Sequence, residues 1–192
     1  LVCCFSASPR PRDVQLDRAS AASDVYKGKE WQSQFYGKGT KPAERLEKYT
    51  QVFHTVEGNT TFYATPSMTA VHNWKAASHD DFRFTFKLPK FIIRQQQLRH
   101  CQADLKEFLI TMSPLHGRIG QWTIQRPHSF EPSMLPTLQK FCTLFPKQMQ
   151  LGIEVRHLGF FDKGDAEKRF NQWLVEEGIN RIIMDSRPVF SA

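Results

Sequence analysis

Polar side chains that suit acid–base chemistry or anion binding stand at the ends of several apolar segments. The first segment, 52–59, carries a carboxylate (Glu57) and an amide (Asn59) directly after an apolar start. An ordinary buried strand would not hold so many polar groups, whereas a strand that ends at a functional site would. The residues in comparable places further along the chain are Lys87, Gln125, Glu154, Arg156, Asp185 and Arg187.

These residue types indicate a site that transfers protons and holds an anion. Glu57 and Glu154 are the candidates for general acid and base, and Asp185 completes the predicted catalytic set by orienting the other groups. The cations suit a phosphate or a carboxylate on a substrate. The predicted substrate-binding residues are Asn59, Lys87, Gln125, Arg156 and Arg187. An ion-pair network that only satisfies buried polar groups remains the structural alternative.

The elements that position these residues alternate between strands and helices. Segment 82–88 is the clearest strand, because Phe82, Phe84 and Phe86 alternate with polar residues. Strands that alternate with helices favour parallel βαβ units. The predicted strands are 52–59, 82–88, 119–125, 151–156 and 181–185, and the predicted helices are 42–49, 66–77, 101–112, 132–145 and 165–177.

The two faces of these strands differ, and this difference predicts the fold class. One face is apolar and the other carries the polar residues named above. A doubly wound sheet would be apolar on both faces, because helices cover both. We therefore predict an α/β fold of the TIM-like (β/α) barrel type, with its site at the carboxyl ends of the strands.

Composition restricts the class of protein further. The 192 residues are 40% hydrophobic, enough for one core, and no apolar run approaches the length of a membrane helix. The four cysteines show no metal-binding spacing, which favours a reduced, cytoplasmic protein. The net charge of +7 favours anionic partners. Residues 1–28 are predicted to be irregular, with one weak strand at most, and 29–192 to form the barrel domain.

Several ordered sequence blocks resemble the YecE-like family, known as domain of unknown function 72. The resemblance covers Gly28 to Val189. It implies a TIM-like barrel but no established activity, so the fold is expected from it and the function is not. The blocks that carry it are VEGNTTFYATPS, DDFRFTFKLP, LRHC, RIGQWTIQRP, GIEVRH and GINRIIMDSRPV.

The chain also departs from the family pattern in ways that bear on the site. The segment before Lys29 does not match the usual first strand, which leaves strand one in doubt. Ile92-Ile93-Arg94 stands where the family often has Ile-Thr-His, and Gln125-Arg126-Pro127 where it usually has Gln-Leu-Pro. A full barrel takes about 250 residues. We therefore expect the last two strand–helix units to be missing from this chain.

A metal site is weighed and not predicted, and no cofactor is identified. Glu57, Glu154, Asp185 and His157 are possible oxygen and nitrogen ligands. Lys87 and Arg156 would compete for the same carboxylates. Cys101 and Cys142 lie on the apolar sides of predicted helices, where cysteines are usually inert.

The sequence thus supports two functional hypotheses of different classes. The first is an enzyme that acts on an anionic, phosphate-bearing substrate by carboxylate acid–base chemistry. The alternative is a non-catalytic nucleic-acid-binding protein that uses a basic rim. The substrate and the oligomeric state are not predicted. The rim would combine Arg94, Arg99, Arg118 and Arg126 with Phe91, Trp122 and Phe130.

Overall fold

A single six-stranded sheet organises the part of the chain that the computed structural model describes, namely residues 2–5, 35–37, 39–95 and 98–184. The strand order is β1-β6-β5-β4-β3-β2. β2 to β6 are parallel to their neighbours, and β1 pairs with β6 in the antiparallel sense. The strands are β1 (Val2–Phe5), β2 (Thr55–Gly58), β3 (Arg83–Lys87), β4 (Ile119–Gln125), β5 (Leu151–Glu154) and β6 (Asn180–Met184).

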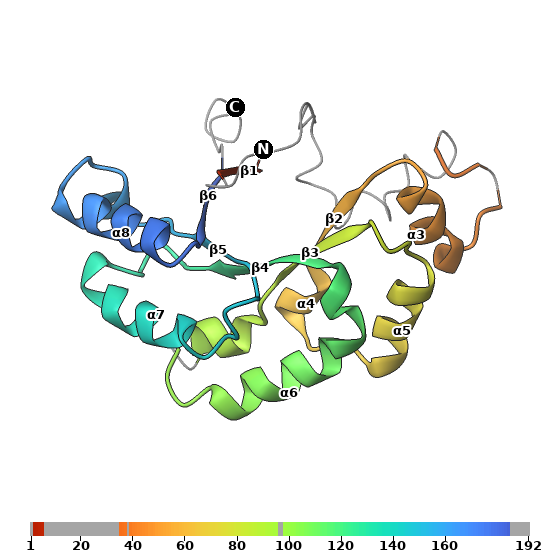
Figure 1. Ribbon diagram of the computed structural model, residues 1–192, viewed down its shortest axis with the longest axis horizontal. Coiled ribbons are helices and arrows are strands. Elements are labelled where there is room, and N and C mark those ends of the chain that lie inside the picture. Colours follow the sequence, from red (N-terminus) through yellow and green to blue (C-terminus); the bar gives the residue numbers. More distant parts are fainter. Residues whose placement is uncertain (1, 6–34, 38, 96–97, 185–192) are drawn as a thin grey trace.

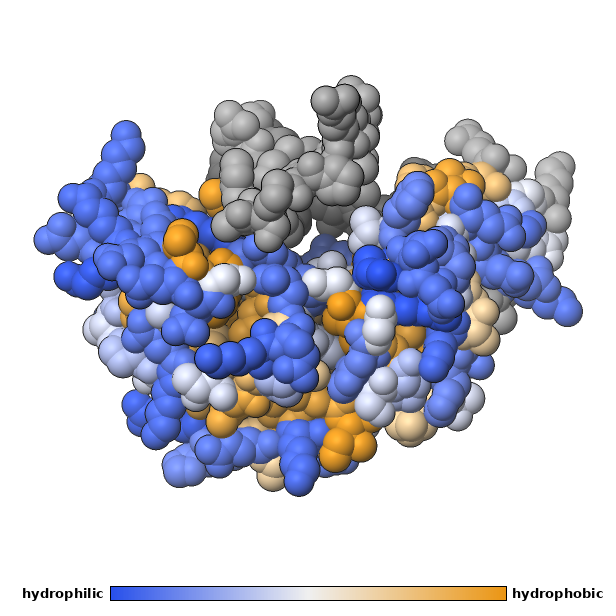
Figure 2. All heavy atoms as spheres, viewed as in Figure 1, coloured by the Kyte–Doolittle hydropathy of each residue, from blue (hydrophilic) through white to orange (hydrophobic). Residues whose placement is uncertain are grey.

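Helices connect the parallel strands and cover one side of the sheet. Figure 1 shows α5, α6, α7 and α8 along the outer side of the curved sheet. Hydrophilic residues dominate the surface in this view, with limited apolar areas between them (Figure 2). Within the described ranges no helix is long and apolar enough to span a membrane. The helices are α3 (Pro42–Thr50), α4 (Thr60–Tyr63), α5 (Met68–Ala76), α6 (Gln102–Met112), α7 (Leu135–Cys142) and α8 (Asp165–Glu176).

Short helical turns complete the connections. A π-helical turn at Phe91–Gln95 follows β3, and the 3₁₀ segment Ser113–Arg118 leads into β4. Two further 3₁₀ turns, Pro132–Met134 and Leu158–Phe160, follow β4 and β5.

The core lies between the sheet and the helices, on the face that the phenylalanine alternation predicted. Phe84 and Phe86 are buried there. The Trp74 ring of α5 stacks on Phe86 at 5.5 Å between centroids, and Phe108 of α6 meets Trp122 edge-on at 5.5 Å. Aromatic side chains bury large apolar areas, so these contacts hold the helices on that face. The opposite face of the sheet is left to the polar residues.

The structure confirms an α/β fold with a parallel five-stranded sheet. Each predicted strand and helix is present, with ends shifted by a few residues; β4 has the predicted bounds. Val2–Phe5 is a strand, and its partner is β6. The remainder of the segment predicted to be irregular lies outside the described residues.

One element was not predicted, and its cause is a tertiary contact. Thr60–Tyr63 forms the short helix α4, although β-branched and aromatic residues favour strands. The Thr61 hydroxyl lies 3.0 Å from the Gly58 carbonyl and 2.7 Å from the Lys87 carbonyl. This contact with β3 outweighs local propensity, and β2 ends at Gly58.

Candidate functional site

The sheet register places most of the predicted site residues on the face opposite the helices, called here the inner face. Glu57 lies opposite Thr85, and Lys87 lies opposite Thr123. Side chains alternate between the two faces of a strand, and Glu57 contacts Lys87 across the sheet. Glu57 and Lys87 therefore lie on the inner face, near the carboxyl ends of their strands. Gln125 and Glu154, which lie opposite each other on β4 and β5, are on the same face.

Glu154 forms the best-defined polar cluster of the inner face. Its side chain is 5% exposed. Gln125 Nε2 donates to Glu154 Oε2 at 2.8 Å, and Arg156 Nε donates to Glu154 Oε1 at 2.7 Å. Both carboxylate oxygens are thus engaged. In the described part of the chain, Arg156 uses only Nε among its side-chain nitrogens, so Nη1 and Nη2 are left for another acceptor.

Glu57 and Lys87 form a second pair on neighbouring strands. Lys87 Nζ lies 3.1 Å from Glu57 Oε1, and both side chains are mostly buried. Thr61 joins the ends of the two strands that carry this pair, because its hydroxyl contacts both the Gly58 and the Lys87 carbonyls. The turn after β2 and the end of β3 are therefore held together directly beside the ion pair.

The two predicted acid–base residues are not neighbours. Glu57 is on β2 and Glu154 on β5, three strands along the sheet. At about 4.8 Å per strand, their backbones are roughly 14 Å apart along the sheet. Each carboxylate instead has its own cation. The structure groups the predicted residues into two locally neutral pairs.

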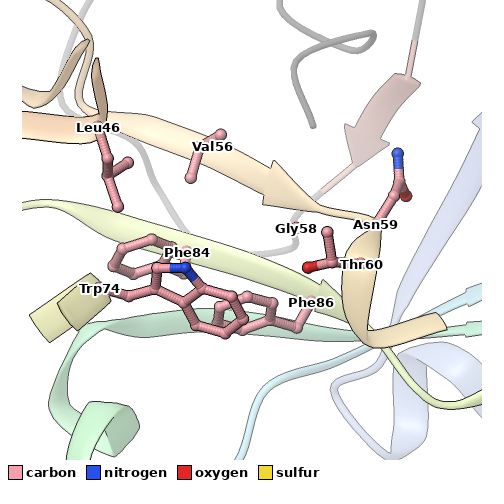
Figure 3. A pocket seen from close by; sticks show the side chains of 8 residues that line it. All are labelled: Leu46, Val56, Gly58, Asn59, Thr60, Trp74, Phe84 and Phe86. Atoms are coloured by element: carbon pink, nitrogen blue, oxygen red, sulfur yellow. The ribbon is translucent and has the colours of Figure 1, made fainter. Parts of the chain in front are cut away.

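The remaining predicted residues have different placements. Asn59 occupies the N-cap position of α4 without a side-chain capping hydrogen bond and, in Figure 3, points away from the cavity beside it. Asp185 and Arg187 lie outside the described residues. Asn180, which was not predicted, donates to Gln121 Oε1 at 2.6 Å on the inner face. The strand was predicted to begin at 181, which hid Asn180 from the alternation pattern.

A small cavity lies on the helix side of β2 and β3 (Figure 3). Its volume is about 20 Å³, room for a single water. Leu46, Val56, Trp74, Phe84 and Phe86 make its lining mostly apolar. We assign this cavity to imperfect packing between helices and sheet and not to ligand binding.

The structure brings together only part of the predicted basic rim: Arg99, Arg126 and Phe130 line one cavity, whereas Arg118 lies elsewhere. Arg118 precedes β4 and donates to the carbonyls of Lys75 and Ser78 and to Asp80 Oδ1, each at 2.5 Å. It therefore ties the end of α5 to the start of β4, at the opposite end of that strand from Arg126. Trp122 and Phe130 are buried and present no ring for base stacking. The side chain of Arg94 lies outside the described residues.

The cysteines of the helical layer are protected thiols. Burial is the main cause that raises the pKa of Cys101, and it raises the pKa of Cys142 to about 12. Thiolate is the reactive form of cysteine. A raised pKa disfavours the thiolate in the buried Cys101 and the partly buried Cys142, in agreement with the inert cysteines that the sequence predicted.

Comparison with known proteins places the chain among proteins of unknown function. The profile of the family described as "Protein of unknown function DUF72" matches residues 23–191. The UPF0759 protein YecE of Escherichia coli is 48% identical over 147 residues, which are 77% of this chain and 54% of that protein. The chain thus spans about half the length of the curated relatives it matches.

Two solved structures have a similar fold. A DUF72 family protein from Thermotoga maritima is 25% identical, with a TM-score of 0.65 over 81% of this chain and 60% of the other. One from Enterococcus faecalis is 24% identical, with a TM-score of 0.65 over 77% of this chain and 55% of the other.

Proposed function

The chain belongs to the family of proteins of unknown function DUF72, and we propose that it contributes to a TIM-like barrel enzyme that acts on an anionic, phosphate-bearing substrate. The support for a barrel is the layering: helices lie on one side of five parallel strands, and the other side is polar. The longer relatives supply room for further strands. In such barrels the site lies at the carboxyl ends of the strands, where Glu57, Lys87, Gln125, Glu154 and Arg156 occur.

The Gln125–Glu154–Arg156 cluster is the observation that carries this proposal. Glu154 engages Arg156 through Nε and leaves Nη1 and Nη2. These two nitrogens form a planar fork that matches two oxygens of a phosphate. A guanidinium held in this way loses less freedom when an anion binds. Arg156 is therefore the principal anion-binding residue, and Glu154 is the residue that positions it.

Glu57 is the better candidate for proton transfer. Its Oε1 contacts Lys87, while within the described residues Oε2 accepts no hydrogen bond and remains able to accept a proton. Lys87 supplies a second positive charge beside it. A substrate held by Arg156 would have to reach from the end of β5 across β4 and β3 to Glu57, roughly 14 Å along the sheet. A substrate with a phosphate at one end and a reacting hydroxyl or carbon several bonds away fits this separation.

A screen of ligands by thermal unfolding tests the binding part of the proposal. A ligand that binds the native state raises the midpoint of unfolding. We expect at least one sugar phosphate or other phosphomonoester to raise it. Arg156→Gln should reduce the affinity about tenfold, since a hydrogen bond to a charged group is worth about 1.5–3 kcal/mol. Arg169→Gln, an exposed residue of α8, is the matched control.

A second experiment separates the anion-binding role of Arg156 from the proton-transfer role of Glu57. Once a substrate is known, Glu57→Gln should keep its binding and lose its turnover. If no phosphorylated compound raises the midpoint, or if Arg156→Gln binds as tightly as Arg169→Gln, the inner-face pairs are structural and the proposal is wrong. Binding of single-stranded oligonucleotides alone, weakened steeply by salt, would favour the nucleic-acid alternative.

A further inference from the structure

A separate cavity lies outside the sheet, beside the loop that follows β4, and is called here the arginine pocket. Its volume is about 310 Å³, at the lower end of the range for small-molecule sites. Among the described residues that line it, none carries a carboxylate. The polar and charged residues of the lining are Arg99, Arg126, Ser129 and Thr137, and Phe130 and Met134 contribute apolar walls.

Arg126 is the fixed charge of this pocket. Its side chain is buried although it is cationic, and it directly follows Gln125 of the inner-face cluster. Nη1 donates to the Ile93 carbonyl. The guanidinium carbon lies 4.6 Å from the centre of the Phe130 ring, and that ring stacks on Phe160 at 6.0 Å. A hydrogen bond and a cation–π stack thus hold the guanidinium in one orientation.

The loop that carries Arg126 is itself fastened to the end of β5. The Arg126 backbone N–H donates to the Glu154 carbonyl at 2.7 Å. His128 Nδ1 lies 3.0 Å from the Arg156 carbonyl. These bonds leave the loop little freedom, so the cavity exists before any ligand arrives. Preorganisation of this kind lowers the entropic cost of binding.

Arg99 supplies an exposed second charge from another element. It lies between Leu98 and His100, whose φ angles of 64° and 54° are in the left-handed region. Leu98 and Cys101 are buried while Arg99 is exposed. Non-glycine residues in this conformation cost of order 1–3 kcal/mol each. The tight bend holds Arg99 among the residues that line the pocket.

We propose that the arginine pocket binds the phosphate group of a small molecule, independently of the inner face. Arg126 acts as the fixed cation and Arg99 as the cation that closes over the anion. Ser129 and Thr137 provide hydroxyl donors. Met134 is the N-cap residue of α7 and Thr137 lies in its first turn, where the helix dipole also favours negative charge. The volume of about 310 Å³ suits a phosphomonoester and not a polymer.

Calorimetric titration of the full chain with inorganic phosphate tests this proposal. Arg99→Gln should weaken phosphate binding about tenfold, because a hydrogen bond from a charged group is lost. The side chain is exposed, so the substitution should leave the fold intact. Arg169→Gln removes the same charge from an exposed position of α8 and should leave the affinity unchanged. Arg126→Lys keeps the charge but removes the fork, and should also weaken binding. Circular dichroism checks the fold of Arg126→Lys. If Arg126→Lys does not fold, the comparison of Arg99→Gln with Arg169→Gln tests the proposal by itself.

The titration is repeated in the Arg156→Gln background, so that phosphate held at the inner face does not contribute. Retention of the Arg99-dependent binding there supports an independent site. Equal affinities of Arg99→Gln and Arg169→Gln, or no phosphate binding in that background, would overturn the proposal. A single-stranded oligonucleotide that binds through Arg99, when inorganic phosphate does not bind, would overturn its small-molecule form.

Discussion

At the scale of single residues, neighbours decide what each polar group of the inner face can do. Glu57 and Glu154 are alike in the sequence, since each stands near the end of a strand. In the structure both Glu154 oxygens are engaged by donors, whereas Glu57 contacts one lysine. This difference is the reason why we propose positioning for Glu154 and proton transfer for Glu57, a distinction that strand position alone does not make.

Gly152 is a residue at which a single methyl group should disturb the inner face. An alanine Cβ there would lie 2.4 Å from Gln121 Nε2 and 2.8 Å from Ile182 Cδ1. The Gln121 amide would have to move away from Asn180. We expect Gly152→Ala to lower the free energy of unfolding by about 1–3 kcal/mol, the usual cost of overpacking. Urea denaturation measures it.

Gly117→Ala is the control for this prediction, because nothing lies within 4 Å of its added Cβ. Its stability should stay within about 0.5 kcal/mol of the parent. Equal stability of the two variants would show that the inner face around Gln121 is looser than described.

The thiol of Cys142 should make stability fall at alkaline pH. Its folded-state pKa is raised from 9.0 to about 12 by burial. Between these values the unfolded chain releases the proton and the folded chain keeps it, so the stabilising contribution is present below pH 9 and is lost as pH rises toward 12. The slope approaches about 1.4 kcal/mol per pH unit.

Cys142→Ala should lower stability at neutral pH and flatten this alkaline decline, as urea denaturation across the pH range would show. If the parent and the variant decline in parallel above pH 9, Cys142 does not cause the loss.

At the scale of elements, the end of β3 depends on the turn that follows β2. The buried Thr61 hydroxyl is shared between the Gly58 and Lys87 carbonyls. Thr61→Val keeps the shape and removes the donor, which should cost about 1–3 kcal/mol because buried carbonyls lose their partner. Thr111→Val is the control, since its hydroxyl contacts only the Glu107 carbonyl on an exposed helix face. Chemical denaturation of both variants measures their free energies of unfolding. If Thr61→Val loses no more stability than Thr111→Val, the end of β3 does not depend on the turn after β2.

At the scale of the whole molecule, one continuous core joins the helical layer to the sheet. Buried residues of a single cluster run from Tyr36 to Leu174. Trp74 reports on the β2–β3 side and Trp173 on α8. A shared core predicts cooperative unfolding. Variants that keep only one of these tryptophans should therefore show the same denaturant midpoint by fluorescence. Two separate midpoints would mean that the part of the molecule around β2 and β3 unfolds independently of the part around α8.

The sequence alone determined the alternation of elements, the apolar face and the family. These features are local or depend on ordered motifs, since a period of two residues marks a strand and a period near 3.6 marks a helix. The five parallel strands and their covering helices were predictable for that reason. The short helix α4 was not, because a side-chain contact with β3 decides it.

Only the tertiary structure decided which polar groups meet. Gln125 and Glu154 are 29 residues apart, and Gln121 and Asn180 are 59 apart. Strand register sets these pairs through backbone hydrogen bonds between remote segments, which residue spacing does not encode. Arg118 and Arg126 flank the strand that the sequence predicted over 119–125, and only their partners depended on the tertiary structure. One clamps a helix end, and the other forms the wall of a pocket.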